Sequence, residues 1–469
     1  MPRYLLPLVF LMASFTGHAA ATGHAAGDSA AERLAQAVQI RTISHQDRSQ
    51  IDYGEFLRFH DFLRASYPRV FGELSVELVN EYSLLIRWPG TDPSLQPVLF
   101  TGHFDVVPIE PGTEGDWLHP PFSGAIAEGR IHGRGTLDDK LGVMSLLEAA
   151  EQLLVAGYQP RREAVFALGH DEEIGGSAGA RMIAARMQAM DLKFAWMMDE
   201  GGFLMSDSPL LPDKPVALIN VAEKGYLTLT LVSTGDGGHS SNPPKISTIG
   251  RLSNAMARIE ANPLPPRLVG PVRAMFETVA PHVDQPRRFV FENLWLTGPL
   301  VANMLADDRL TTPFVRTTTA LTMFNAGVKE NVVPQRAEAR VNFRLLPGDT
   351  PEMVVDHVRD IVDDPLVEIS YEQWQNIPPV SDHRGPGFAA IEQAVLQSYP
   401  DAVVAPSLLM ATTDTRHYID LAENQYRFRG MMIASDQAKS VHGTNEFVTV
   451  ESYEKAIAVA RDTLQLGTR

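Results

Sequence analysis

Three apolar segments of this chain each end in residues that can bind a metal ion, and this constrains the fold more than any other feature. Residues 164–168 run into Gly-His-Asp-Glu-Glu-Ile-Gly-Gly at 169–176. Residues 98–100 lead into Thr-Gly-His-Phe-Asp at 101–105, and residues 194–198 lead into Asp-Glu-Gly-Gly at 199–202. Because open α/β sheets bind their ligands at the carboxyl ends of the strands, the three termini predict a single metal site at one sheet edge.

Two adjacent carboxylates, Glu172 and Glu173, stand in the glycine-rich turn of the first of these segments. Neighbouring side chains at a strand end diverge, so one carboxylate can bind a metal while the other reaches a water molecule that the metal activates. A solvated helix start with acidic residues near its N-terminus is the alternative for this octapeptide alone. The other two strand ends favour the metal site.

Strand and helix patterns predict two domains, one inserted in the other. Between residues 27 and 222, apolar strands alternate with amphipathic helices, which indicates an α/β domain with a mostly parallel sheet flanked by helices. Residues 223–377 follow the ferredoxin-like order β-α-β-β-α-β. Within them, residues 262–316 are rich in proline and are expected to form a helical or irregular excursion. Residues 378–469 return to the first domain.

Composition narrows both the partners and the metal ligands. The 469 residues carry a formal charge of −17, which disfavours nucleic acid and anionic membranes as partners. The chain contains no cysteine, so thiolate metal sites, thiol nucleophiles and disulfides are excluded. Any metal ion must therefore be held by imidazole and carboxylate groups.

The first residues have the pattern of a secretory signal peptide. Arg3 precedes a short apolar run, and alanine-rich sequence follows within residues 1–26. The run is shorter than the roughly 20 residues of a membrane-spanning helix. An exported protein, periplasmic or secreted and without a stable membrane anchor, is therefore expected; an uncleaved anchor is the alternative.

Five motifs, in this order, resemble those of the M20 family of metallopeptidases. They are Gly-His-Phe-Asp-Val-Val-Pro at 102–108, Gly-Arg-Gly-Thr-Leu-Asp-Asp-Lys at 133–140, Glu-Glu-Ile-Gly-Gly at 172–176, Asp-Glu-Gly at 199–201 and His-Gly-Thr-Asn-Glu at 442–446. Trp-Leu-His-Pro-Pro-Phe at 117–122 and the long excursion resemble the carboxypeptidase S and N-acyl-amino-acid hydrolase branch. The resemblance implies a zinc-peptidase-like catalytic domain with an inserted lid.

The resemblance also implies a site for two zinc ions. His103 and Asp199 would bind the first ion, Glu173 and His442 would bind the second, and Asp138 would bridge both. Nitrogen and oxygen ligands suit zinc, and a carboxylate can span two ions about 3.5–4 Å apart. Cobalt or manganese would also suit this ligand set.

Further acidic residues receive roles that do not involve direct metal binding. Asp105 lies two residues after His103 and can accept the second N–H of its imidazole, which fixes the tautomer. Glu172 is implied as the general base, which takes a proton from the attacking water and passes it to the departing nitrogen. Asp139 remains an alternative ligand beside Asp138, and His170 is expected to be a packing residue.

Three residues of the inserted domain resemble the family's substrate contacts. His239 would donate to the carbonyl oxyanion when the domain closes, and Asn325 could add a hydrogen bond. Arg344 could hold a substrate carboxylate through two hydrogen bonds, although an arginine at a strand end is commonly just solvated. Thr-Thr-Asp-Thr-Arg at 412–416 resembles the family's Gly-Gly-Thr-Asp-Ala-Arg loop, but Ala411 and Thr412 replace its usual glycines.

The expected function is that of a two-zinc amidohydrolase that cleaves the amide bond next to a C-terminal amino acid. A carboxypeptidase or dipeptidase acting on short peptides is the first reading, and an N-acyl-amino-acid hydrolase is the alternative. A catalytically silent binding protein would have lost ligands or base, and none is missing here. An aminopeptidase-like site is disfavoured by Arg344. A homodimer is a further alternative, in which His239 of one chain would act at the metal site of the other.

Overall fold

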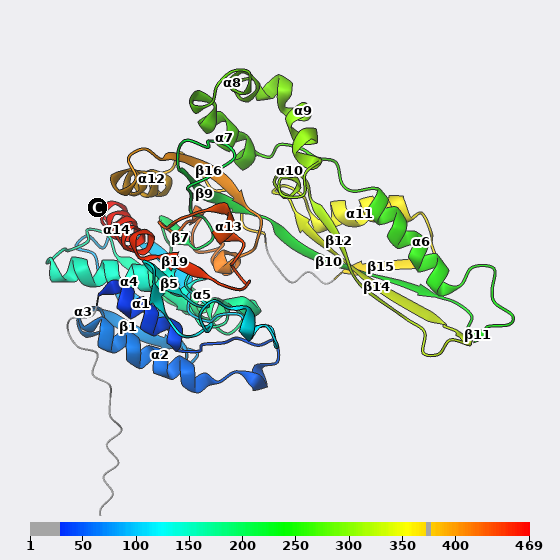
Figure 1. Ribbon diagram of the computed structural model, residues 1–469, viewed down its shortest axis with the longest axis horizontal. Helices are drawn as coiled ribbons and strands as arrows, with labels where there is room; N and C mark the ends of the chain where they lie inside the picture. Colours follow the sequence, from blue (N-terminus) through cyan, green and yellow to red (C-terminus); the bar gives the residue numbers. More distant parts are fainter. Residues whose placement is uncertain (1–28, 372–376) are drawn as a thin grey trace, which may run out of the picture.

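The computed structural model describes residues 29–371 and 377–469 (Figure 1). The predicted signal peptide, residues 1–26, lies outside the described residues. Within those two ranges, no helix combines the length and the hydropathy that crossing a bilayer requires.

The main domain is built on a ten-stranded sheet, and its centre is parallel as predicted. The central strands run parallel to one another: β6 (Ala164–Gly169), β3 (Val98–His103), β7 (Trp196–Asp199) and β17 (Gln425–Arg427). Two antiparallel strands extend one side, β1 (Ser75–Val79) and β2 (Ser83–Trp88). The other side holds β9 (Val216–Glu223), β8 (Leu204–Met205), β18 (Met432–Ile433) and β16 (Val403–Leu409).

Successive residues of a strand point to opposite sides of the sheet. Since the buried strands are apolar at successive positions, both faces of the sheet must be covered. Val98 and Phe100 pack into a core with the helices of one face, whereas Leu99 packs into the core of the other face. The first face is covered by α1 (Ala30–Gln39), α2 (Tyr53–Ser66), α3 (Pro68–Glu73), α4 (Lys140–Val155), α12 (Pro386–Ser398) and α14 (Val450–Gly467). The second face is covered by α5 (Ala180–Ala189).

The inserted domain has the predicted ferredoxin-like topology. Its antiparallel sheet has the order β12 (Thr318–Ala326), β14 (Arg336–Leu345), β10 (Gly225–Thr234), β15 (Val367–Tyr371). Helices α6 (Thr248–Ala261) and α11 (Pro351–Val362) close a separate core against it. Two short strands, β11 (Gly238–His239) and β13 (Val332–Val333), pair at its outer tip, far from the main sheet (Figure 1).

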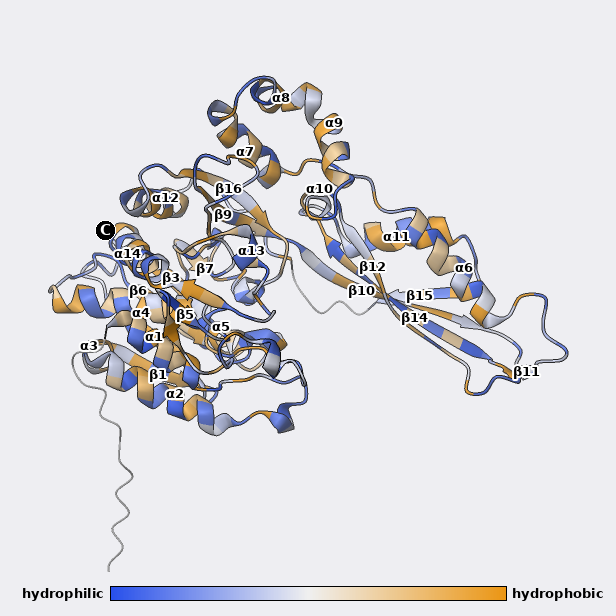
Figure 2. Cartoon of the chain, in the orientation of Figure 1, coloured by the Kyte–Doolittle hydropathy of each residue, from blue (hydrophilic) through white to orange (hydrophobic). Residues whose placement is uncertain are grey.

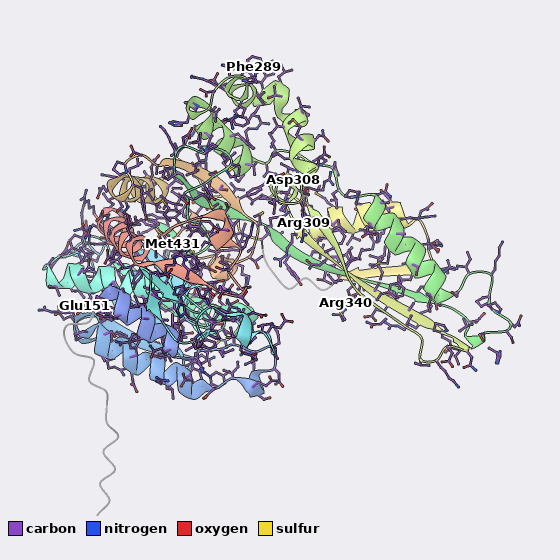
Figure 3. All side chains as sticks on the ribbon, viewed as in Figure 1. Glu151, Phe289, Asp308, Arg309, Arg340 and Met431 are labelled. Atoms are coloured by element: carbon purple, nitrogen blue, oxygen red, sulfur yellow. The ribbon has the colours of Figure 1, made fainter. Side chains whose placement is uncertain are left out.

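The excursion is helical and docks on the main domain. It contains α7 (Gly270–Val279), α8 (Arg287–Glu292), α9 (Leu294–Ala306) and α10 (Thr312–Val315). Val272 of α7 shares a core with Val216 of β9 and Ala405 of β16. Apolar residues recur along α7 and α9 (Figure 2), and Phe289 of α8 marks the outer end of the excursion (Figure 3). The excursion thus covers the outer strands of the main sheet.

A small three-stranded sheet brings the end of the chain to the predicted site. It has the order β19 (Phe447–Thr449), β5 (Arg130–His132), β4 (Ile126–Ala127). The pairing of β19 with β5 sets residues 442–446 beside residues 133–138. The short helix α13 (Ser435–Ala438) precedes this segment.

Candidate active site

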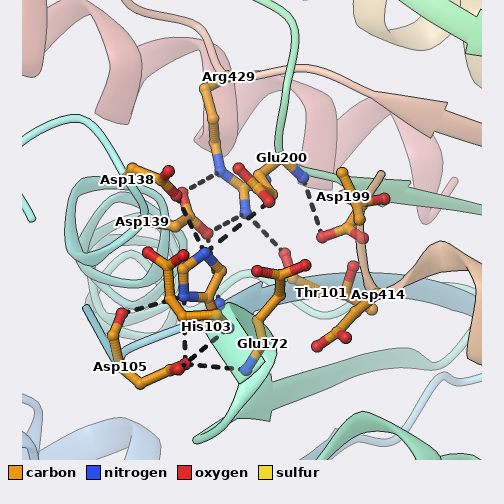
Figure 4. A network of polar contacts seen from close by, with 12 residues as sticks. Thr101, His103, Asp105, Asp138, Asp139, Glu172, Asp199, Glu200, Asp414 and Arg429 are labelled. Carbon is orange, nitrogen blue, oxygen red and sulfur yellow. Dashed lines mark hydrogen bonds and ion pairs between the residues drawn. The ribbon is translucent and has the colours of Figure 1, made fainter. Parts of the chain in front are cut away.

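Asp138 stands between two imidazoles at the centre of the site. Its Oδ1 lies 3.0 Å from His103 Nε2, and its Oδ2 lies 3.0 Å from His442 Nε2. A second carboxylate also contacts His442, since Glu173 Oε2 lies 3.1 Å from His442 Nε2. His103 ends β3, Glu173 follows β6, and Asp138 directly precedes Asp139 and α4, so three elements converge here. Figure 4 shows His103 and Asp138 side by side.

Glu446 holds the Asp138 loop against the segment that carries His442. Its Oε1 accepts hydrogen bonds from the backbone N–H groups of Gly135, at 3.1 Å, and Leu137, at 2.7 Å. Its Oε2 accepts from Arg134 Nη1 at 2.6 Å. His442 itself adopts a left-handed backbone conformation with φ of 59°. These bonds fix the two motifs relative to each other across about 300 positions of sequence.

Asp105 orients both the histidine and the acidic pair. Its Oδ1 lies 3.3 Å from His103 Nδ1, which leaves Nε2 free for a metal ion. The same carboxylate accepts hydrogen bonds from the backbone N–H of Glu172, at 3.1 Å, and of Glu173, at 3.2 Å. Ser44 Oγ donates to it at 2.5 Å. The sequence predicts the contact with His103, but the contacts with the acidic pair appear only in the structure.

Glu200, rather than Asp199, presents its carboxylate to His103. Glu200 Oε1 lies 3.8 Å from His103 Nε2. Asp199 turns back, so that its Oδ1 accepts the backbone N–H of Glu200 at 2.9 Å, and its Oδ2 is buried without a partner. The structure therefore does not bring the predicted ligand Asp199 into the cluster. The neighbouring acid of the same motif occupies the place expected for it.

Asp139 and His170 both lie apart from the cluster. Both carboxylate oxygens of Asp139 accept hydrogen bonds from Arg429, at 3.0 and 2.7 Å. The structure therefore disfavours Asp139 as an alternative ligand. His170 is buried, and its Nδ1 lies 2.7 Å from Ser83 Oγ. Its ring packs edge-on against Phe56, so the prediction of a packing residue is confirmed.

The electrostatics of the cluster favour a bound cation. Burial, with Asp138 nearby, raises the pKa of Glu173 to about 7, and burial raises the pKa of Glu172 and of Glu200 well above the usual range. The charged forms of these carboxylates are therefore destabilised by burial, and a nearby cation would stabilise them. Glu173 Oε1 is buried without a hydrogen-bond partner. A buried acceptor without a donor is costly unless a metal ion completes it.

Two overlapping groups of side chains could each hold an ion. His103, Asp138 and Glu173 form one group, and His103, Glu172 and Glu200 form the other, with the ligand atoms of each group within 4.8 Å of one another. Imidazole nitrogen and carboxylate oxygen are the ligands of zinc sites that lack cysteine. The donor set present therefore fits the predicted metal centre.

A cavity of about 260 Å³ opens beside the cluster. Asp138, Glu172, Glu173, Glu200 and His442 form its polar end. Its apolar wall is formed by Leu137, Phe203, Leu409, Met431 and Val441. Ala411, Thr412 and Thr413 also line it, so the predicted loop reaches the cavity despite its missing glycines. Arg416 of this loop places Nη2 3.9 Å from Glu172 Oε1.

The three predicted substrate contacts of the inserted domain do not line this cavity in the described part of the chain. His239 is exposed in β11, where its Nδ1 lies 2.8 Å from Ser241 Oγ. Asn325 is exposed on β12. Arg344 is half-buried on β14 and stacks on Tyr226, with its guanidinium carbon 4.6 Å from the ring centre.

The chain matches known proteins over most of its length. Residues 99–466 match the model of peptidase family M20/M25/M40. "Probable carboxypeptidase S-like 2" of Dictyostelium discoideum is 41% identical over 435 residues, which cover 91% of this chain and 83% of that protein. The N-fatty-acyl-amino acid synthase/hydrolase PM20D1 of Bos taurus is 39% identical over 442 residues, 93% of this chain and 87% of that protein.

The fold is shared with solved structures. The crystal structure of the M20 family metallo-carboxypeptidase Sso-CP2 from Sulfolobus solfataricus superposes with a TM-score of 0.68. It is 19% identical, and the match covers 94% of this chain and 100% of that chain. At this identity the likeness shows a common fold.

Proposed function

Since this chain belongs to peptidase family M20/M25/M40 and is a hydrolase of amide bonds, we propose that it uses two metal ions to cleave the amide bond next to a C-terminal amino acid. One observation carries the two-metal proposal. The two oxygens of Asp138 face different imidazoles, each at 3.0 Å. Glu200 lies 3.8 Å from the first imidazole, and Glu173 lies 3.1 Å from the second. A carboxylate in that position can bridge two ions about 3.5–4 Å apart.

His103, Asp138 and Glu200 would hold the first ion, and Asp138, Glu173 and His442 would hold the second. Glu200 replaces the predicted Asp199 in this set, because its carboxylate is the one that lies beside His103. We propose zinc, with cobalt or manganese as substitutes that the same ligands accept. When bound, the ions polarise the scissile carbonyl and lower the pKa of water.

Glu172 is the proposed general base. It borders the cavity, its backbone N–H is held by Asp105, and Arg416 Nη2 lies 3.9 Å from its Oε1. A carboxylate there takes the proton of the attacking water and delivers it to the departing nitrogen. Arg416 favours the charged form of Glu172, which offsets part of the effect of burial on its pKa.

Arg344, Asn325 and His239 are proposed to bind substrate when the inserted domain approaches a site. Arg344 would pair with the free carboxylate of the C-terminal residue. His239 lies at the outer tip of the inserted domain (Figure 1), so a second copy of the chain is a route by which it could reach a metal centre. We therefore include a homodimer in the proposal.

An N-acyl-amino-acid hydrolase is the second candidate, and the apolar wall of the cavity favours it. Phe203, Leu409, Met431 and Val441 offer an aliphatic or acyl group a surface beside the metal ligands. The PM20D1 relative acts on N-fatty-acyl amino acids, as its name states. Short peptides and N-acyl amino acids share the scissile amide and the terminal carboxylate, so one site can serve either.

We also propose that residues 1–26 direct export to the periplasm or the medium. Sequencing the N-terminus of the protein recovered from the exported fraction would test this. A chain that still begins at Met1 would contradict it.

Metal analysis combined with a substrate panel tests the proposed function. The purified protein should contain two metal ions per chain and hydrolyse members of a panel of dipeptides and N-acyl amino acids. Chelation should abolish the activity, and zinc should restore it. A protein that binds no metal, or that hydrolyses only substrates lacking a C-terminal carboxylate, would contradict the proposal.

A further inference from the structure

We propose that Arg429 is a positioning residue of the metal centre, which keeps Asp139 out of the metal coordination so that Asp138 alone bridges the ions. The inference rests on the metal site of the proposed function. It concerns two adjacent acids of one motif, Asp138 and Asp139. The first faces the imidazoles of His103 and His442. The second faces Arg429 (Figure 4).

The pair between Arg429 and Asp139 is buried and bidentate. Arg429 Nε donates to Asp139 Oδ1 at 3.0 Å, and Nη2 donates to Oδ2 at 2.7 Å. Asp139 is 0% exposed and Arg429 is 4% exposed. Charge-assisted bonds of this kind are strong where water is excluded. Asp139 therefore has both oxygens engaged before any metal ion arrives.

Asp139 would otherwise be a competitor for the ions, because it lies directly behind a metal ligand. Its Oδ2 is 3.4 Å from the backbone N of His103. A buried carboxylate that loses its partner is costly and is attracted to any nearby cation. The guanidinium supplies a fixed positive charge in place of a metal ion and leaves the bridge to Asp138.

Two glycines provide the space for this pair. A Cβ at Gly142 would lie 2.1 Å from both Arg429 Nε and Asp139 Oδ1. A Cβ at Gly102 would lie 2.8 Å from Asp139 Oδ2 and 2.9 Å from Arg429 Nη2. No side chain tolerates such distances without a shift, so the start of α4 and the end of β3 each carry glycine where the pair must fit.

Arg429 also connects the segments that carry the ligands of the first ion. Its Nη2 donates to Thr101 O at 2.8 Å, two residues before His103. Its backbone N–H donates to Gly202 O at 2.6 Å, two residues after Glu200. Arg429 borders the cavity, and its Nη1 is buried without a partner. The guanidinium thus ties the oriented Asp139 to the strand that carries His103, and the backbone of the same residue is bonded to the segment that follows Glu200.

Cobalt binding in a double-mutant cycle tests this role. Arg429→Met should free Asp139 to enter the coordination of Co²⁺, which changes the visible absorption spectrum of the bound ion. It should also lower kcat about 10- to 100-fold, the usual effect of removing a group that orients metal ligands. Adding Asp139→Asn to Arg429→Met removes the competing charge, and this double variant should recover the parent's spectrum.

The outcomes separate a positioning role from a structural one. If Arg429 only stabilises the fold, Arg429→Met will melt earlier but bind Co²⁺ with the parent's spectrum and affinity, and the proposal is overturned. If Arg429→Met does not fold, Arg429→Lys can be used, because lysine keeps the positive charge but cannot form two parallel hydrogen bonds with Asp139. This variant should show a smaller change of the Co²⁺ spectrum in the same direction. An unchanged spectrum in Arg429→Lys also overturns the proposal. A parent protein that binds no Co²⁺ would instead count against the proposed metal site itself.

Discussion

Replacing Glu172 by glutamine should abolish most turnover while leaving the metal centre intact. Glutamine has nearly the same volume as glutamate. The backbone N–H of residue 172, which donates to Asp105 Oδ1 at 3.1 Å in the parent protein, would keep this hydrogen bond. Only the proton-accepting carboxylate is lost. A general base contributes about 10²- to 10⁴-fold. At about 1.36 kcal/mol per factor of ten, the variant should lose about 2.7 to 5.4 kcal/mol of transition-state stabilisation.

The assay is kcat and kcat/KM of the zinc-loaded protein on the best substrate of the panel, with metal content and melting temperature measured on the same sample. Glu173→Gln is the matched control, because the same change one residue later removes a proposed ligand that lies 3.1 Å from His442 Nε2. It should lose metal, whereas Glu172→Gln should not. If Glu172→Gln keeps more than about a tenth of the parent's kcat, below the lower bound for a general base, the assignment is refuted.

Three further results are expected. His442→Ala should reduce the metal content from two ions towards one, measured by plasma mass spectrometry; loss of both ions or of neither would contradict the separate second site. Arg344→Ala should raise KM for substrates with a free C-terminal carboxylate and spare their carboxamides; equal losses on both would exclude the carboxylate contact. In the metal-free protein, burial raises the pKa of Glu173 to about 7, so the folded state binds more protons than the unfolded chain, whose glutamates titrate near about 4.3. The melting temperature of the metal-free protein should therefore fall as pH rises from 5 to 8, and zinc should cancel this fall. A melting temperature that increases with pH in the presence of a chelator would contradict the burial argument.

The position of the site could be predicted from sequence because it depends on strand polarity. β3, β6 and β7 are short apolar segments whose ends carry His103, Glu173 and the Asp199-Glu200 pair. Parallel pairing sets those ends at one edge, with His103 opposite Gly169. The alternation of strands and helices likewise predicts the ferredoxin-like order of the inserted domain. The local sequence pattern is therefore sufficient to predict which residues lie together wherever the order and direction of the strands alone determine their positions.

The main-sheet strands β8, β9 and β16 are not predicted from the sequence, and for β9 and β16 the local sequence gives a physical reason. β9 (Val216–Glu223) runs almost directly into β10, since only Lys224 separates them, so the boundary between the two sheets has no turn residues to mark it. β16 contains Pro406, which disfavours a strand in local terms. It pairs with β9 on one side only, where the missing N–H of proline is tolerated.

The choice between Asp199 and Glu200 could not be made from sequence, since adjacent acids in one motif offer the same chemistry. Side-chain direction decides it: the Asp199 carboxylate caps the next N–H, and the Glu200 carboxylate extends towards His103. For Asp138 and Asp139, the family resemblance assigns the bridge to Asp138 and keeps Asp139 as an alternative. In the structure Asp138 faces the two imidazoles, whereas Asp139 pairs with the distant Arg429. The placement of His239 depends on the arrangement of whole domains, which no local pattern encodes.

Anomalous diffraction at the zinc edge from crystals of the zinc-loaded protein tests the central claim most directly. Two peaks about 3.5–4 Å apart are expected, bridged by Asp138, with His103 and Glu200 at one peak and Glu173 and His442 at the other. Glu172 should contact neither peak and should face the solvent between them. A single peak, or a peak bound by Glu172 or Asp139, would contradict it.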